Sequence, residues 1–354
     1  MNYHTPKKLP INIDYAKIAK NLSNAQYYLG RLDGRQSNLQ NPLLLIAPLT
    51  AKEATVSSKI EGTQSTISDV FLHEAGEETK YSDVIEVSNY KKAILYAKDE
   101  LIKKPLTLNL IKNTHAILLE NTRGESRRGD LRTDQVWLGL EGDPIEKASY
   151  IPPKPELVPD YMYNLEEFIN TKEDDALIQA ALTHYQFEAV HPFNDGNGRI
   201  GRLLIPLVIY YRKKLSLPIL YLSGYFENNK QAYIKALHKV DLENDYEYWI
   251  NYFLEAVAYQ AVETETLINK ILELFNVTRT QVEEAKSPYM SKLVEFIFKK
   301  PVFSVPMISD YLKCHRATSL RLVSNLKSHK IITEFKAPKT NRNIYIFSEL
   351  IKLL

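Results

Sequence analysis

Residues 191–202 read HPFNDGNGRIGR, and the chain on both sides of this stretch indicates how it folds. Residues 181–190 are amphipathic, and Pro192 disfavours a helical conformation in the residue before it, so a helix should end at His191. Apolar residues at three- and four-residue spacing over 200–213 predict a second helix. The stretch is therefore expected to form a short, glycine-bounded bend between two helices.

The bend carries groups that bind anions. Gly196, Asn197 and Gly198 are expected to adopt positive φ angles, which would turn successive N–H groups toward one point. This nest would open onto the N-terminus of the next helix, whose dipole also favours phosphate. Arg199 and Arg202 are three residues apart on that helix, so both side chains could reach the same phosphate oxygens.

A candidate metal ligand and a candidate base flank the bend. Asp195 could ligate Mg²⁺, which prefers a carboxylate together with substrate phosphate oxygens. His191, with an ordinary pKa near ~6.5, could accept a hydroxyl proton near neutral pH. Together these groups predict phosphoryl or nucleotidyl transfer, in which positioning and charge stabilisation provide most of the catalysis. The alternative is a glycine-rich turn between core helices with a histidine at the surface.

Two common nucleotide-binding motifs fit this chain poorly. A Rossmann fingerprint requires a strand before its glycines, whereas a helix is expected before this bend. A P-loop requires Gly-Lys-Ser or Gly-Lys-Thr, and the chain contains neither.

At residues 191–202 the sequence resembles the Fic family, whose signature is H-P-F-x-[D/E]-G-N-G-R-x-x-R. Every fixed position of the signature matches, and the resemblance extends over roughly residues 108–253. It implies the helical Fic fold and transfer of AMP from Mg-ATP to a Ser, Thr or Tyr hydroxyl of a target protein, with release of pyrophosphate. The phosphate-transferring Doc relatives carry Lys where Gly198 stands, which argues against that subgroup.

The resemblance also assigns roles to individual residues. His191 resembles the base that deprotonates the target hydroxyl, Asp195 the metal ligand and Arg202 the γ-phosphate anchor. The remaining phosphate-binding positions are Gly196, Asn197, Gly198, Arg199 and Gly201. Tyr233 is a candidate contact for the adenine side of ATP, with a place in the core as the alternative.

The composition changes over residues 127–159. Gly and Pro become frequent, and the β-favouring residues 136–138 and 149–151 flank the turn-forming residues 141–144. This pattern predicts a β-hairpin flap. The resemblance implies that the flap binds the target in an extended conformation by strand addition.

Residues 57–62 read SSKIEG and match a second family pattern, [S/T]-x-x-x-E-[G/N]. Taken alone, they indicate a helix C-terminus with Gly62 as its cap and an exposed glutamate. The resemblance implies that Glu61 pairs with Arg202 and inhibits the enzyme, while Ser57 steadies the helix. In some relatives this glutamate helps remove AMP from the target, so de-AMPylation at the same site remains an alternative.

The whole chain reads as mainly helical and multidomain. It has 354 residues, only 12 glycines and no apolar run long enough to span a membrane. With no signal peptide and a single cysteine, Cys314, a soluble cytoplasmic protein is expected. Before the C-terminal region, helices are predicted over 16–29, 42–58, 84–102, 108–119, 161–169, 175–190, 200–213, 230–240 and 246–275.

Charge separates the C-terminal region from the rest. Residues 286–354 contain 13 Lys and Arg but 4 Asp and Glu, a net +9, which leaves −7 for the rest of a chain that carries +2 overall. Helices over 291–298, 305–312 and 316–328, followed by two strands within 331–347, have the order of a winged helix-turn-helix. Basic residues of the third helix and the wing favour DNA, with protein docking as the alternative.

The resulting organisation has four parts. They are an N-terminal helical region (1–107) with the inhibitory motif, a Fic core (108–253), a linking helix (254–286) and a winged-helix domain (287–354). The predicted protein is an autoinhibited, ATP- and Mg²⁺-dependent protein adenylyltransferase. A homodimer is possible, and no membrane partner is expected. The non-enzymatic alternative is a DNA-binding regulator that uses the Fic core as a nucleotide sensor, although a sensor has no need of His191.

Overall fold

The computed structural model describes residues 3–37, 43–78, 81, 83–139, 144–171, 174–283, 287–336 and 342–354, and it is mainly helical. The N-terminal half contains α1 (Tyr15–Ser37), α2 (Leu43–Ile60), α3 (Ile67–Glu74), α4 (Val84–Leu101), α5 (Leu108–Leu118), α6 (Val158–Asn170) and α7 (Ala176–Val190). It continues with α8 (Asn197–Tyr211), α9 (Ser223–Asn228), α10 (Lys230–Glu243) and α11 (Tyr246–Glu283). Three short 3₁₀ helices are Glu125–Arg127, Ile145–Lys147 and Pro155–Leu157. The C-terminal unit contains α12 (Met290–Lys299), β1 (Val302–Ser304), α13 (Val305–Leu312), α14 (Arg316–Ser328), β2 (Thr333–Lys336), β3 (Asn343–Ile346) and α15 (Ser348–Leu353).

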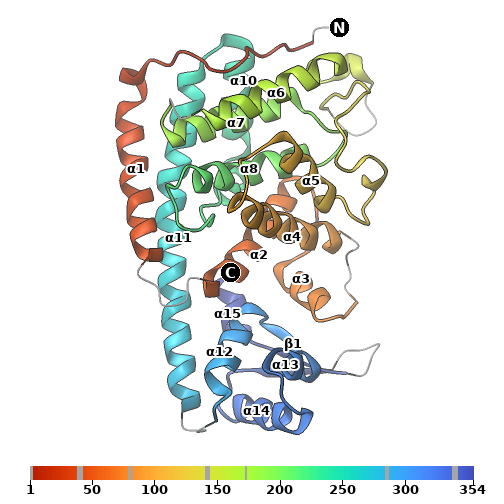
Figure 1. The fold of residues 1–354 in the computed structure, drawn as a ribbon, viewed down its shortest axis with the longest axis vertical. Helices are drawn as coiled ribbons and strands as arrows, with labels where there is room; N and C mark the ends of the chain where they lie inside the picture. Colours follow the sequence, from red (N-terminus) through yellow and green to blue (C-terminus); the bar gives the residue numbers. More distant parts are fainter. Residues whose placement is uncertain are drawn as a thin grey trace.

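The helix α7 lies at the centre of the larger part of the molecule (Figure 1). All of its residues except Glu188 are buried, polar ones such as Gln179 and His184 included, so the helix is covered on every side and has no solvent-exposed face of the kind that the sequence suggested. The Trp249 indole of α11 donates a hydrogen bond to the Ala181 carbonyl at 2.8 Å. Burial on all sides therefore anchors the end of α7, where the half-buried His191 follows.

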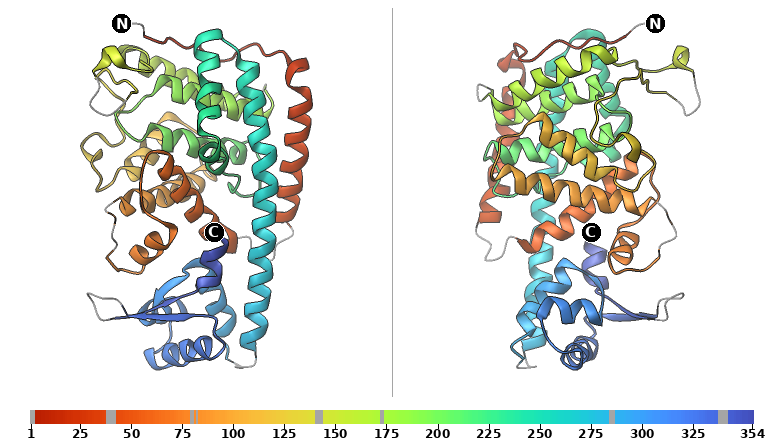
Figure 2. Two further views of the ribbon diagram at one scale, coloured as in Figure 1. Left: turned by 180° about the vertical axis from the view of Figure 1, so that it is seen from behind. Right: turned by 45° about the vertical axis from the view of Figure 1, so that its right-hand side comes forward.

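The long helix α11 runs from this part of the molecule into the C-terminal unit, with α1 beside it (Figure 2). Polar pairs join the two helices along their length. They are Asn21 with Asn251 at 2.9 Å, Arg31 with Glu265 at 2.8 Å and Arg35 with Asn269 at 2.9 Å. Because α11 is one unbroken helix, the predicted boundary between residues 253 and 254 falls inside it, and the predicted linking helix is its continuation.

The described part of the C-terminal unit combines four helices with a three-stranded antiparallel sheet in the order β1-β3-β2. Its elements follow the order predicted for residues 287–354, with β1 and α15 in addition. A small apolar cluster joins this sheet to the N-terminal region: Ile344 and Val302 pack with Ala51 of α2 and Phe71 of α3. The unit is therefore packed against the helix that carries Glu61.

Other expectations need correction. The α1 helix continues past Gly30 to Ser37, and α3 and α9 were missed although the Thr66–Asp69 capping box marks the start of α3. The predicted hairpin is reduced, among described residues, to one antiparallel bridge between Leu138 and Tyr150, and residues 141–143 of its predicted turn at 141–144 lie outside the described part.

The physical reason for the reduced hairpin is local. Pro144 has no N–H to donate to a ladder and fixes its own φ, and a 3₁₀ helix follows it directly. Within the described residues, no helix is long and apolar enough to cross a membrane.

Candidate active site

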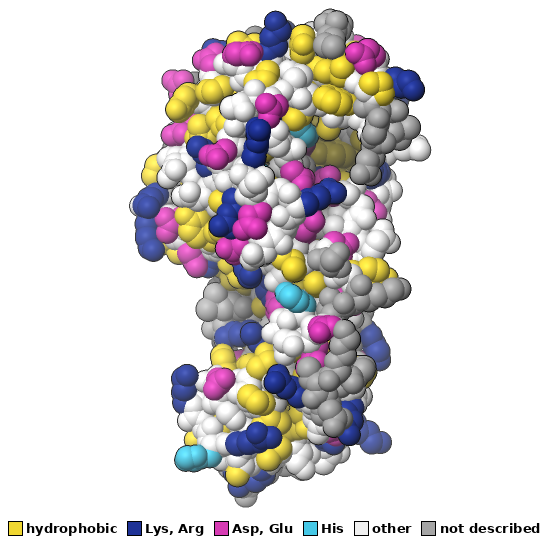
Figure 3. Space-filling view, turned by 90° about the vertical axis from the view of Figure 1, so that its right-hand side faces the viewer, with side chains coloured by type: hydrophobic (Ala, Val, Ile, Leu, Met, Phe, Trp, Pro, Cys, Tyr) yellow, Lys and Arg dark blue, Asp and Glu magenta, His cyan; other side chains and the backbone are white. Residues whose placement is uncertain are grey.

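A cavity of about 770 Å³ lies where the end of α2, the flap, the α7–α8 bend and α10 meet. In the space-filling view, the face of the molecule shown has a hollow in its upper half, with apolar side chains in its depth (Figure 3). The cavity wall includes five of the predicted site residues: Glu61, His191, Gly198, Arg202 and Tyr233. The structure thus brings together residues that are up to about half the chain length apart.

His191 lies at the mouth of the bend, with a left-handed backbone conformation (φ 50°) at the end of α7. Its carbonyl accepts a hydrogen bond from Arg132 Nε at 2.8 Å, and the Pro192 carbonyl accepts one from the Arg132 amide at 2.9 Å. Burial, followed by the charge of Arg132, lowers the pKa of His191 to about 4. The imidazole is therefore neutral at neutral pH and able to accept a proton.

The bend is braced by buried side chains. Asn197 bonds both backbone groups of Phe193, each at 2.8 Å, and therefore holds the bend rather than facing the cavity. His115 accepts a hydrogen bond from the Gly129 amide at Nδ1, and its Nε2 lies 2.9 Å from the Asp195 carbonyl. Neither His115 nor Arg132 was identified from the sequence, because both lie far from the motif in the chain and carry no motif of their own.

The predicted nest has a different backbone from the one expected. Of its three residues only Gly196 has a positive φ, at 75°, and α8 already begins at Asn197 instead of residue 200. The anion-binding groups are thus the first amides of a helix, which have no partner within the helix, together with its dipole. A helix N-terminus still favours an anion at this point.

Gly198 and Gly201 have separate steric roles. A Cβ at Gly198 would collide with the Glu61 carboxylate and lie 2.9 Å from Arg202 Nη1, so only glycine leaves room for that pair. A Cβ at Gly201 would collide with the Glu188 carboxylate of α7. Gly201 is thus a point of close packing between α7 and α8, and it is not among the residues of the cavity wall.

Arg202 is held by residues of the motif at 57–62. Its Nη2 lies 2.6 Å from Glu61 Oε1 and 2.9 Å from the Ser57 carbonyl, and its Nε donates to Ser57 Oγ at 2.8 Å. Arg202 is buried, whereas the Glu61 side chain is 40% exposed toward the cavity. Burial alone would raise the pKa of Glu61, but Arg202, Arg199 and His191 together hold it below its ordinary value.

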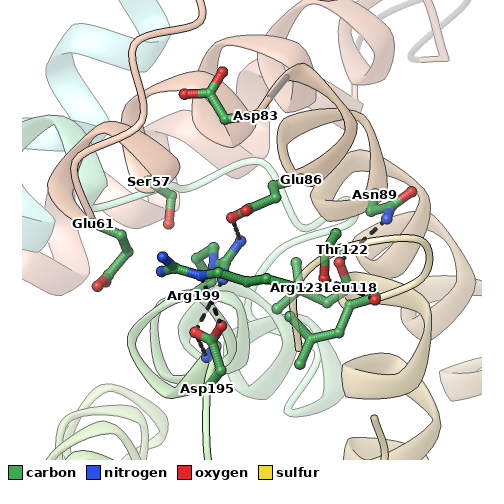
Figure 4. A network of polar contacts seen from close by, with 12 residues as sticks. Ser57, Glu61, Asp83, Glu86, Asn89, Leu118, Thr122, Arg123, Asp195 and Arg199 are labelled. Atoms are coloured by element: carbon green, nitrogen blue, oxygen red, sulfur yellow. Dashed lines mark hydrogen bonds and ion pairs between the residues drawn. The ribbon is translucent and has the colours of Figure 1, made fainter. Parts of the chain in front are cut away.

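Arg199 and Asp195 form a second polar cluster beside the first (Figure 4). Arg199 is 3% exposed and pairs with Glu86 of α4 at 2.5 Å and with Asp195 at 3.5 Å. Asp195 also lies 3.5 Å from Arg123 and accepts a hydrogen bond from the Gly196 amide. Arg199 therefore points toward α4, away from the cavity wall where the sequence had placed it.

Tyr233 and Glu188 complete the wall on the α7 and α10 side. Tyr233 is buried, shares a 2.8 Å hydrogen bond with His184 and stacks on Phe226 at 4.4 Å, so it is both a core aromatic and part of the cavity wall. Burial raises the pKa of Glu188 to about 7, and within the described residues its Oε1 has no hydrogen-bond partner. Glu188 was not identified from the sequence.

The described residues contain no group of three His, Cys, Asp or Glu side chains that could hold a metal ion by themselves. Asp195 is nevertheless compatible with Mg²⁺, because that ion is commonly held by one or two carboxylates with substrate phosphates and water. Its side chain is 30% exposed, and its ion pairs are long. A magnesium ion bound here would be shared with the phosphates of a nucleotide.

Two sequence models of one family match the chain in succession. The Fic/DOC family N-terminal model matches residues 19–99 and the Fic/DOC family model matches residues 105–209, which together cover more than half of the chain. The chain belongs to the Fic/DOC family. The motif at 191–202 lies inside the second match, and the Glu61 motif lies inside the first.

Curated Fic relatives are similar to part of this chain. A probable protein adenylyltransferase of Aquifex aeolicus is 25% identical over 205 residues, which is 54% of this chain and 55% of that protein. The protein adenylyltransferase Fic of Nematostella vectensis is 29% identical over 165 residues, covering 43% of this chain and 36% of that protein. The chain thus spans about half or less of the length of these relatives.

Solved Fic structures share the fold. A Fic family protein from Desulfovibrio desulfuricans superposes with a TM-score of 0.64 at 18% identity, covering 96% of this chain and 98% of that one. Residues 134–508 of Fic-1 from C. elegans give a TM-score of 0.55 at 20% identity, covering 71% and 74%. The mainly helical Fic fold predicted from the sequence is confirmed.

Proposed function

We propose that this Fic protein is a protein adenylyltransferase that transfers AMP from ATP to a Ser, Thr or Tyr hydroxyl of a target protein and is inhibited by Glu61. One observation carries the proposal: the Glu61 carboxylate lies against Gly198 at the N-terminus of α8 and pairs with Arg202, in a cavity that also exposes His191. A carboxylate thus occupies the place where a phosphate would meet a helix N-terminus and a buried arginine.

The chain's groups suit this transfer. The target hydroxyl oxygen would attack the α-phosphorus of ATP, the bond to the β-phosphate oxygen would break, and pyrophosphate would leave. His191 would accept the hydroxyl proton, and its pKa of about 4 keeps it unprotonated beforehand. Asp195 would hold Mg²⁺, which neutralises phosphate charge when bound. Arg202 would bind the γ-phosphate once Glu61 withdraws, and Ser57 would keep the guanidinium oriented.

Intact-mass measurement tests the proposal directly. The Glu61→Gly protein, incubated with ATP and Mg²⁺, should gain the mass of one AMP group by self-modification, and Glu61→Gly with His191→Ala should gain none. A gain of phosphate alone would instead place the protein with the phosphate-transferring relatives. No gain on the protein itself or on proteins of a cell extract, with both variants folded, would contradict the proposal.

De-AMPylation is the second enzymatic candidate. It is favoured by the position of Glu61, whose carboxylate lies in the same cavity as His191 and could orient a water molecule. Incubating an AMP-modified target with parent protein and with Glu61→Gly distinguishes the directions. Loss of AMP that requires Glu61 would assign removal to this site, whereas gain of AMP that Glu61 suppresses would assign transfer.

For the C-terminal unit we propose a winged helix-turn-helix that binds duplex DNA through α14 and the wing. Arg316, Leu320 and Arg321 on α14 are exposed, while Leu322, Val323 and Leu326 form its buried side. Lys and Arg side chains are spread over the lower part of the face in Figure 3. Exposed basic residues at the start of a second helix suit contacts with phosphates and base edges.

Fluorescence titration with labelled duplex DNA tests this second proposal. Binding should weaken steeply as salt increases, and Arg316→Glu with Arg321→Glu should abolish it. The matched control is Lys235→Glu, an exposed residue of α10 outside the unit. Absent or salt-insensitive binding would indicate a protein-docking module instead.

A further inference from the structure

Arg199 lies at different distances from its two carboxylate partners, Glu86 and Asp195, and this difference affects how Asp195 could bind a divalent cation. Arg199 lies 2.5 Å from the Glu86 carboxylate but 3.5 Å from that of Asp195, although Asp195 is one helical turn away on the same segment. The other Asp195 oxygen lies 3.5 Å from Arg123, whose side chain is 77% exposed. Asp195 is therefore surrounded by two arginines without being in close contact with either.

Glu86 is placed to hold Arg199 permanently. It lies in the first turn of α4, where the helix dipole favours a negative charge, and its side chain is 18% exposed. Figure 4 shows its carboxylate joined to Arg199 on the side of α4, apart from Asp195. Arg199 is 3% exposed and cannot turn to solvent, so a weaker hold by Glu86 would transfer its charge to Asp195.

A guanidinium in close contact with Asp195 would oppose binding of a cation there. It would occupy the carboxylate oxygens that the ion needs, and its positive charge would repel Mg²⁺ across a few ångströms of partly buried space. Glu86 counters both effects, because it draws the guanidinium away and supplies a compensating negative charge. Outer residues that orient a metal ligand in this way commonly control the affinity for the metal.

We propose that Glu86 is a positioning residue that holds Arg199 off Asp195 and so leaves the Asp195 carboxylate free to bind the divalent cation. The proposal rests on the metal-ligand role given to Asp195 in the proposed function. It assigns Glu86 the opposite role from Glu61: Glu61 pairs with an arginine that the nucleotide needs, whereas Glu86 pairs with an arginine that the metal ion must avoid.

The test is Mn²⁺ binding, measured by electron paramagnetic resonance with and without ATP, in the Glu61→Gly background. Glu86→Gln should weaken Mn²⁺ binding roughly tenfold or more, as loss of an orienting partner does at other metal sites. Glu86→Asp, which keeps the charge, should restore most of the affinity. Asp195→Asn gives the level of binding expected with the ligand itself removed.

A matched control is another ion pair of the same helix α4, with its carboxylate on α3. Glu74→Gln breaks the 2.8 Å ion pair between α3 and Lys91 of α4, and it should leave Mn²⁺ affinity unchanged. In transfer assays, Glu86→Gln should raise the Mg²⁺ concentration needed for half-maximal rate, with the rate at saturating Mg²⁺ within about threefold of its background.

Two outcomes would overturn the proposal. Unchanged Mn²⁺ affinity in a folded Glu86→Gln protein would show that the Glu86–Arg199 ion pair has only a structural role. Increased AMP transfer by Glu86→Gln with Glu61 intact would make Glu86 a second inhibitory carboxylate. Mn²⁺ binding is measured without turnover, so the two proposals can fail separately. If Glu86→Gln weakens Mn²⁺ binding in a protein that never transfers AMP, the proposed function is contradicted and the role of Glu86 is supported.

Discussion

The two arginines of the motif meet their carboxylates in different surroundings. Arg202 pairs with Glu61, the residue directly after α2, facing a cavity, and the carboxylate is 40% exposed. Arg199 pairs with Glu86 in the first turn of α4, away from the cavity, and that carboxylate is 18% exposed. The same chemical pair thus faces a ligand-sized space at Glu61 and is packed between helices at Glu86.

The rest of α2 indicates how Glu61 can leave. Upstream of it on the same helix, Ser57 bonds Arg202, Glu53 accepts hydrogen bonds from Tyr90 and Ser223, and Thr50 bonds Tyr221. These buried contacts hold α2 to three other parts of the protein. Release of Arg202 is therefore expected through the last turn around Glu61 and not through departure of the whole helix.

The largest effect is expected from His191→Ala, which changes neither arginine of the motif. In the Glu61→Gly background it should lower AMP transfer by roughly 10²–10⁴-fold, the usual contribution of a general base. Transfer is measured with labelled ATP, and His329→Ala in the C-terminal unit is the control. A variant that retained most of the activity would show that the arginines act without this base.

The next largest effect is expected from removal of the Glu61 carboxylate. Glu61→Gly should raise transfer about tenfold or more over the parent, because close charge pairs couple by about 1.5 kcal/mol or more. Glu227→Gln, which removes the 3.4 Å pair between α9 and Lys59 near the same helix end, should leave the rate at the parental level. Equal activity of Glu61→Gly and parent would contradict an inhibitory role.

A smaller effect, of opposite sign, is expected at Ser57. In the Glu61→Gly background, Ser57→Ala should lower kcat/KM for ATP roughly five- to tenfold, since a hydrogen bond to a charged group contributes about 1.5 kcal/mol. The Ser57 carbonyl still holds Arg202, which limits the loss. Ser58→Ala is the control, because Ser58 Oγ has no partner among the described residues. A rise in activity would make Ser57 part of the inhibition.

The smallest effect concerns the shape of the pH–rate profile and not the size of the rate. Because the pKa of His191 is lowered to about 4, the neutral base persists well below the ordinary histidine range. The kcat/KM of Glu61→Gly measured between pH 5 and 7 should show no acid limb from this residue. A limb with a midpoint near ~6.5 would mean that the reacting histidine is solvated like a free imidazole.

Much of the fold was predictable because local patterns and tertiary packing agree. Helices α4, α5, α7 and α13 occur within two residues of their predicted bounds. The α1 helix was predicted to stop near Gly30, but a glycine costs only about 1 kcal/mol in a helix, and packing along α11 outweighs that. Helix α11 likewise exceeds its prediction because it packs against both parts of the molecule.

The sequence by itself determined the chemistry available at the bend, since His191, Gly198 and Arg202 follow from a motif of fixed spacing, and it paired Glu61 with Arg202 through a second motif. Only the tertiary structure decided that Arg199 pairs with Glu86 of α4, that Asn197 braces the bend and that Gly201 lets α7 and α8 pack closely. The reason is physical: spacing along a helix sets which way a side chain points, but its partner is set by packing between segments distant in the chain. Glu86, His115 and Arg132 meet the motif only through that packing.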